Sequence, residues 1–171
     1  MADEKSRRAA ELADKLEETV ARFEVVVEGL SSKQWQMQAV NHPTIHLGDK
    51  DEERSVGTLA HHVAVGDFNV TQMVGMIASG KGLPPLDGAQ LAQSNAEQAR
   101  QHPSPDKAAT IALLRKNAAD SAELVRGLTD SQLKQTGQLF GRDFTTESLI
   151  EEILIRHPQW HIESIQATTG A

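Results

Sequence analysis

The sequence predicts an all-α protein that folds as a bundle of four long helices. Apolar residues recur at three- and four-residue steps in four segments, residues 6–28, 55–77, 104–128 and 145–167. No convincing strand pattern competes with them, and runs of β-branched residues are few. A chain of 171 residues can bury about 70% of its unfolded surface without a disulfide or a metal. We therefore expect one domain over residues 1–171, in which any metal serves function.

Composition excludes several classes of function. The formal net charge is -7 and the basic residues are scattered among acids, which argues against binding nucleic acid or an anionic membrane surface. The absence of cysteine excludes a thiolate nucleophile, a cysteine-ligated zinc site and a disulfide framework. The first residues are charged, and no run approaches the roughly 18 apolar residues of a membrane span. The default expectation is a cytoplasmic protein.

The first two helices are predicted from their apolar stripes and their ends. Residues 6–28 carry a stripe that Gly29 ends: Leu12, Leu16, Val20, Phe23, Val27 and Leu30. Residues 36–54 have no period and end in a charged run, which predicts a long loop. Ser55 is a good N-cap for a helix through Ile77, with an inward face of Val56, Leu59, His62 or Val63, Gly66, Val70, Met73 and Ile77.

The remaining helices follow the same logic. Asp87 is expected to cap a short helix through Ala99, and Ser104 with Pro105 to begin the third long helix. That helix has the stripe Ile111, Leu114, Ala118, Ser121, Val125 and Leu128. Residues 139–144 suggest a short turn. The last helix runs from near Thr145 to about Ala167, with Leu149, Ile150, Ile153, His157, Trp160 or His161, and Ser164 or Ile165 facing inward.

A repeated segment supports a two-fold organisation. Residues 29–35, Gly-Leu-Ser-Ser-Lys-Gln-Trp, resemble residues 127–133, Gly-Leu-Thr-Asp-Ser-Gln-Leu. Each copy follows a long helix and precedes an irregular connection to a new helix. The sequence therefore predicts the order helix, loop, helix, made twice.

Three histidines on apolar stripes are the candidate metal ligands. His157 and His161 are four residues apart, so a helix places them on one face about one 5.4 Å turn apart. His62, on the stripe of another helix, is the best candidate for a third ligand. Catalytic zinc sites typically use three protein ligands and keep a position open for water or substrate. The ordinary alternative is that these are core histidines, each with its own hydrogen-bond partner.

Other polar residues near this pattern have weaker claims. Asp67 is five residues after His62 and about 140° round the helix, so we consider it a candidate catalytic proton acceptor or a partner of a metal ligand. His61 points about 100° away from His62 and is expected to be exposed. Pro158 removes an amide from the last helix, which predicts a kink that either is incidental or re-aims the two histidines. We expect the histidines of the predicted loops, His42, His46 and His102, to be solvated, with the alternative that His42 or His46 lies over the site.

Two motifs carry a resemblance to a known family. Ser55-Val-Gly-Thr-Leu-Ala-His-His62-Val63 resembles a family pattern Ser-Val-x-x-Leu-x-x-His-Leu/Val, and His157-Pro-Gln-Trp-His161-Ile-Glu-Ser-Ile165 resembles its His-x-x-x-His-x-x-x-Ile. Asp67 matches an acidic residue often found five after the first histidine, and Asn95-Ala-Glu97 resembles an Asn-containing stretch. In their order and spacing, these motifs are similar to those of the DinB-like (DinB/YfiT) superfamily of metalloenzymes. Trp160-His161-Ile162 departs from the commoner His-His-Arg ending.

The resemblance implies a fold, a metal and a class of reaction. The fold would be a four-helix bundle with a long crossover connection, often a homodimer, holding a divalent ion on His62, His157 and His161. Relatives include thiol-dependent transferases and isomerases, which implies a small-molecule substrate. Because this chain has no cysteine, a low-molecular-weight thiol would have to arrive as a cosubstrate.

Two hypotheses of function follow from these patterns. The first is a metal-dependent enzyme, either a thiol-dependent transferase or a hydrolase. The alternative is a non-catalytic ligand-binding or stress-associated dimeric bundle with a structural or vestigial metal site. Imidazole suits zinc, nickel, copper and iron, and among them we expect zinc or nickel. Access of solvent to the ion would distinguish the two hypotheses.

Overall fold

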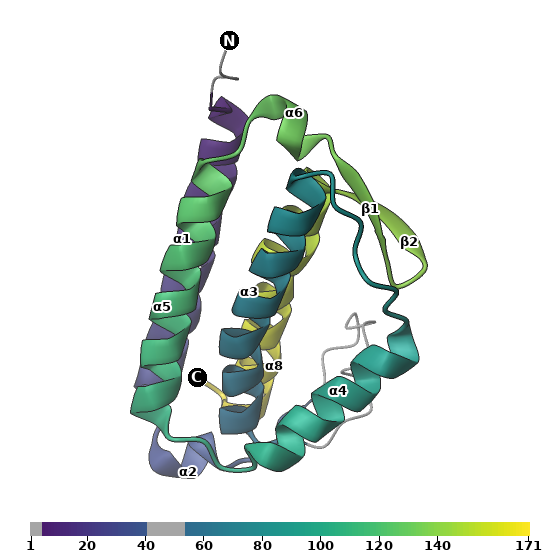
Figure 1. The fold of residues 1–171 in the computed structure, drawn as a ribbon. Helices are drawn as coiled ribbons and strands as arrows, with labels where there is room; N and C mark the ends of the chain where they lie inside the picture. The colour runs from purple at the N-terminus through teal and green to yellow at the C-terminus, as the bar shows by residue number, and fades with distance from the viewer. Residues whose placement is uncertain (1–4, 41–53) are drawn as a thin grey trace.

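Four long helices form the body of the protein, as the sequence predicts (Figure 1). The computed structural model describes residues 5–40 and 54–171. The bundle consists of α1 (Arg7–Gly29), α3 (Val56–Ala78), α5 (Lys107–Arg126) and a C-terminal helix made of α7 (Thr146–Leu149), the π-helical η1 (Ile150–Arg156) and α8 (His157–Thr169). The shorter elements are α2 (Ser32–Trp35), α4 (Gly88–Gln101), α6 (Asp130–Leu133), β1 (Thr136–Leu139) and β2 (Arg142–Thr145).

The long connection between α3 and α5 sets the topology. Helices α3 and α5 point in the same direction, so the chain must return along the bundle between them, and α4 lies on this return (Figure 1). Both α1 and α3 pack against α5, and both also contact the C-terminal helix. The predicted crossover is thus the segment that carries α4.

The ends of most helices are those the sequence predicts. The side chains of Ser55, Asp87 and Thr145 cap their helices, and Asp87 makes a capping box with Gln90. The start of α5 differs: its N-cap is Asp106, whose carboxylate accepts the amide of Ala109 at 2.7 Å, and not Ser104. The Ser104 hydroxyl instead accepts a hydrogen bond from Gln36. The carboxylate of Asp106, two residues after Ser104, therefore caps α5 in place of the predicted serine.

A small antiparallel hairpin was missed by the sequence reasoning. β1 pairs with β2, and the turn between them consists of Phe140 and Gly141, with φ of 55° and 71°. Two consecutive residues with positive φ are typical of the tight hairpin turn that matches strand twist. The predicted short turn is therefore real, but strands of four residues each are too short to show an alternating pattern.

The repeated segments correspond to two short capped helices. Ser31 and Gln34 form a capping box at α2, and Thr129 and Gln132 form the matching box at α6. In each box, the hydroxyl of the first residue accepts a hydrogen bond from the backbone amide of the glutamine three residues later. The side chain of that glutamine accepts a hydrogen bond from the backbone amide of the first residue. The repeated sequence therefore corresponds to a local capping motif that follows α1 and α5.

The core contains most of the predicted stripe residues, but some on α3 and on the C-terminal helix, among them Ile153 and His157, are only half-buried beside a cavity. The stripe residues of α1 and α5 are all buried. On α3, however, Gly66, Val70 and Met73 are only half-buried, because they line a cavity between α3 and α4. The inward stripe of α3 thus serves both the core and the cavity wall.

None of the described helices combines the length and the apolar character that a membrane span requires.

Two glycines of α3 predict opposite effects on stability. A Cβ on Gly57 would lie 2.5 Å from the ring of Trp35, which is buried and donates its Nε1 hydrogen to the Pro105 carbonyl at 2.8 Å. We expect Gly57→Ala to lower the free energy of unfolding by about 1–3 kcal/mol through overpacking. Gly66→Ala meets nothing within 4 Å and should raise it by about 0.5–1 kcal/mol. Urea unfolding of both variants tests this, and equal effects would contradict the close Trp35 contact.

Candidate metal centre

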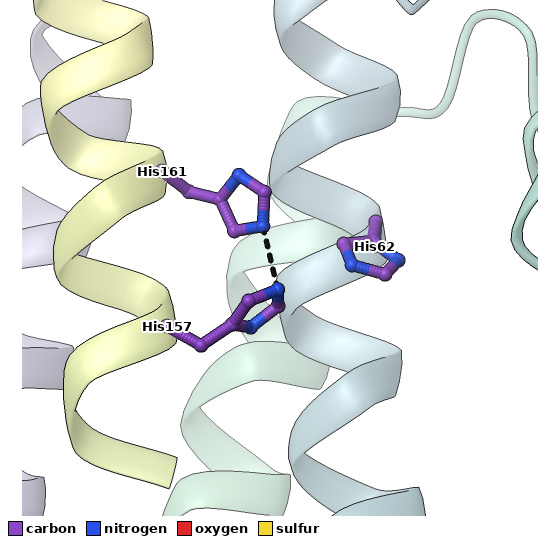
Figure 2. A group of neighbouring side chains, drawn as sticks. All are labelled: His62, His157 and His161. Carbon is purple, nitrogen blue, oxygen red and sulfur yellow. Dashed lines mark hydrogen bonds between the residues drawn. The ribbon is translucent and has the colours of Figure 1, made fainter. Parts of the chain in front are cut away.

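The structure brings His62, His157 and His161 together between α3 and α8 (Figure 2). One ring nitrogen of each lies within 4.8 Å of those of the other two. The ring centroids of His62 lie 5.4 Å from those of both other histidines, and the two rings of α8 are 4.3 Å apart. His161 is completely buried, His62 is buried and His157 is half-buried. Three side chains distant in sequence thus form one compact cluster.

The donor atoms fit a divalent transition ion. The Nε2 atoms of His157 and His161 are 2.9 Å apart and share a hydrogen bond (Figure 2), and two imidazole nitrogens on one tetrahedral zinc ion would lie roughly 3.3 Å apart. Nδ1 of His62 lies 3.1 Å from Oε1 of Gln98. When Nδ1 donates its hydrogen to this amide, Nε2 keeps the lone pair that a metal needs. Gln98 therefore orients His62 as the partner of a metal ligand does.

A π-helical turn immediately precedes the two histidines of α8. The amide of His157 donates to the carbonyl of Glu152, five residues back, where an α-helix would use the residue four back. Pro158 follows and has no amide hydrogen to give. A π turn adds a residue to the helix and rotates the face that follows it. Pro158 therefore lies just after a π-helical segment, at the start of α8.

Asp67 is buried on α3 and lines the same cavity as His62 and His157. Its side chain is 4% exposed, and its Oδ2 is buried with no hydrogen-bond partner among the described residues. Burial raises the pKa of Asp67 to about 7. No described contact joins its carboxylate to a histidine ring, and Gln98 has the place beside His62. The expectation of Asp67 as a partner of a metal ligand thus gains no support, and its role as a proton acceptor stays a proposal.

A cavity of about 680 Å³ opens over the histidines. It lies between α3, α4, the segment of residues 83–86 and the turn of the hairpin. His62 and His157 reach its wall, whereas His161 is not among its lining residues. An ion held by the three rings would therefore face a space large enough for a small molecule.

Sequence reasoning did not find Gln98, although a signal pointed to its helix. Asn95, three residues earlier on α4, is buried and lines the cavity. The Asn95-Ala-Glu97 stretch points to this segment, but the partner of a metal ligand can only be recognised once α4 is placed against α3.

The remaining histidines do not join the cluster. His61 is half-buried, not exposed as expected, and its ring lies 4.2 Å from that of His102. Burial lowers the pKa of His61, and the neighbouring His102 and His62 lower it further. The loop expected for His102 is correct only in part, because its amide ends α4 by donating to Gln98. His42 and His46 lie outside the described residues.

Comparison with known proteins supports the family. The sequence model of the DinB superfamily matches residues 15–165. Among solved structures, the fold is similar to that of YfiT from Bacillus subtilis, a probable metal-dependent hydrolase with an unusual four-helix bundle topology. The TM-score is 0.71 with 18% sequence identity, over 99% of this chain and 90% of that one. None of the curated proteins compared with the chain matches it significantly. Because the family pattern spans nearly the whole bundle, the chain belongs to the DinB superfamily.

Proposed function

We propose that this protein is a divalent-metal-dependent enzyme that acts on a small molecule bound in the cavity. The observation that carries the proposal is the meeting of His62, His157 and His161 beside a space of about 680 Å³. Structural zinc sites are closed by four protein ligands, whereas catalytic sites keep a position for water or substrate. In the part of the chain that the structure describes, the cluster has three histidines, and two of them reach the cavity.

The residues around the cluster support this chemistry. When bound, an ion on three neutral imidazoles acts as a Lewis acid toward a water or a thiol. Gln98 fixes the ring of His62, and the complete burial of His161 holds its ring in place. Asp67, with its raised pKa, is suited to take a proton near neutral pH. These residues supply orientation and proton transfer beside the reacting group.

The finer form of the proposal is a hydrolase or a thiol-dependent transferase that uses zinc or nickel. The likeness to YfiT, a probable metal-dependent hydrolase, favours hydrolysis. A transferase would need an external thiol, since the chain has no cysteine. The small-molecule substrate, the homodimer and the cytoplasmic location belong to the same proposal.

Metal analysis with a spectroscopic probe of the ion tests this proposal. Protein purified without a histidine tag should hold close to one divalent transition ion per chain, because three nitrogen ligands suit zinc and nickel better than magnesium or calcium. After substitution with cobalt, added 2-mercaptoethanol should change the visible spectrum, because an open position accepts a thiolate.

The matched control is His157→Ala, which should lose both the ion and the spectral response. A spectrum that ignores added thiol and other ligands would indicate a closed site and favour the non-catalytic bundle. Protein that binds no more transition metal than His157→Ala would reject the metal centre itself.

A further inference from the structure

The lining of the cavity is mostly apolar, and its described residues include acidic side chains but no lysine or arginine. The acidic side chains are those of Asp67 and Glu97. Apolar side chains make most of the wall: Val70, Met73, Met76, Leu83, Leu86 and Phe140. Such a lining favours an apolar molecule, and it opposes an anion that would have to lie beside a buried carboxylate.

Asp67 is a buried acidic residue of the cavity wall whose carboxylate the described part of the fold leaves without a partner. Its side chain is 4% exposed and lines the cavity, yet no hydrogen bond or ion pair of its carboxylate is found among the described residues. The Thr71 hydroxyl donates to the backbone carbonyl of Asp67 and not to its carboxylate. Buried carboxylates are costly without a partner, so this one suits a group that arrives with a ligand.

The chemistry of that group follows from what a carboxylate accepts. An ionised carboxylate only accepts hydrogen bonds, and its strongest partners are cationic N–H donors. Asp67 lies five residues beyond His62, about 7.5 Å along the axis of α3. One molecule in the cavity can therefore face the histidines with one part and Asp67 with another.

We propose that the cavity binds an apolar molecule that carries a protonated amine, and that Asp67 receives this ammonium group. The inference deepens the proposed function by naming a class of substrate, and it gives Asp67 a binding role in place of the proton-accepting one. It rests on the proposed function only in placing the amine in the cavity beside the histidines. The amine-binding end consists of this chain's own residues and can be measured apart from any reaction.

Two matched fluorescent probes test the preference. Dansylcadaverine ends in an ammonium group, and N-dansylaminohexanoate has the same five-carbon spacer but ends in a carboxylate. Titrated into zinc-loaded full-length protein, dansylcadaverine should bind at least about tenfold more tightly, the factor that one charge-assisted hydrogen bond supplies. In Asp67→Asn this preference should fall to about twofold or less, because the amide carries no charge.

A second acidic residue provides the matched control. Glu97 is exposed at the edge of the cavity and is already paired, with its carboxylate 2.6 Å from Arg100 and also bonded to Gln101. Glu97→Gln should therefore keep the preference for dansylcadaverine. Equal binding of the two probes by the wild type, or an equal loss of preference in both variants, would overturn the role of Asp67.

The His157→Ala variant separates this inference from the proposed function. If the preference persists in His157→Ala while the wild type shows no metal centre, the amine site stands and the metal proposal falls. If the carboxylate probe binds more tightly than the amine in the wild type, and does so only while the histidine cluster is intact, the metal proposal stands and the amine site is rejected.

Discussion

Replacing His62 by alanine is expected to weaken binding of a divalent transition ion by more than about a hundredfold, since loss of a ligand's supporting partner alone costs about 10- to 100-fold. His62 is the only one of the three clustered histidines that α3 contributes, so its removal leaves only the pair on α8. The protein should nevertheless stay folded. The buried stripes of α1 and α5 do not involve the cluster, and metal binding stabilises a protein only by its linkage to the folded state.

The neighbouring His61 provides the control for this prediction. Its ring lies 4.2 Å from that of His102 and outside the cluster, so His61→Ala should bind the ion about as tightly as the wild type. Competition with a coloured chelator measures the affinities, and circular dichroism measures the helix content. Loss of metal in His61→Ala with retention in His62→Ala would show that the assigned ligands are wrong. An unfolded His62→Ala would contradict the expectation that the bundle is stable without the cluster.

The periodicity of the sequence was sufficient to predict the bundle, because each long helix buries a stripe that repeats every three or four residues. The same periodicity distinguished His62 from His61, since only His62 lies on the stripe of α3. The contact of His62 with the pair on α8, however, depends on which helices are neighbours. Periodicity alone does not determine this, and the motif order of the family supplied it.

Features that depend on competition between neighbours could not be predicted from the sequence. Asp106 and Ser104 are both good caps; Asp106 caps α5, while Ser104 contacts Gln36, which is distant in sequence. Gln98 becomes a partner of His62 only after the crossover places α4 against α3. The π turn before His157 similarly replaces hydrogen bonds to the residue four back with hydrogen bonds to the residue five back. Pro158 was the local sign in the sequence that the helix is irregular there.

Asp67→Asn is expected to make the metal-free protein more stable at neutral and higher pH, by an amount that depends on pH. Burial raises the pKa of Asp67 from 3.8 to about 7, so the folded protein favours the neutral acid. The contribution of the neutral Asp67 to the free energy of unfolding is fully present below about pH 4. It is lost as the pH rises through about 7, because the folded protein must then ionise a buried group. At 1.36 kcal/mol per pKa unit, the loss is on the order of 4 kcal/mol.

Asparagine cannot ionise, so the variant should escape this loss. The free energy of unfolding of Asp67→Asn minus that of the wild type should therefore rise by a few kcal/mol between about pH 4 and about pH 8. Urea unfolding in the presence of a chelator, repeated across this range, measures the difference. Asp120→Asn is the control, since Asp120 is exposed and paired with Lys116 on the surface of α5, where such pairs contribute little.

If the free energy of unfolding of Asp67→Asn minus that of the wild type does not change with pH, the carboxylate already has a partner in the folded protein. The proposed amine site would then lose its basis. A rising difference would show that the fold tolerates an unfavourable ionised group beside the histidines. An ammonium ligand that pairs with Asp67 would remove part of that cost, so dansylcadaverine should stabilise the wild type more than Asp67→Asn at about pH 8.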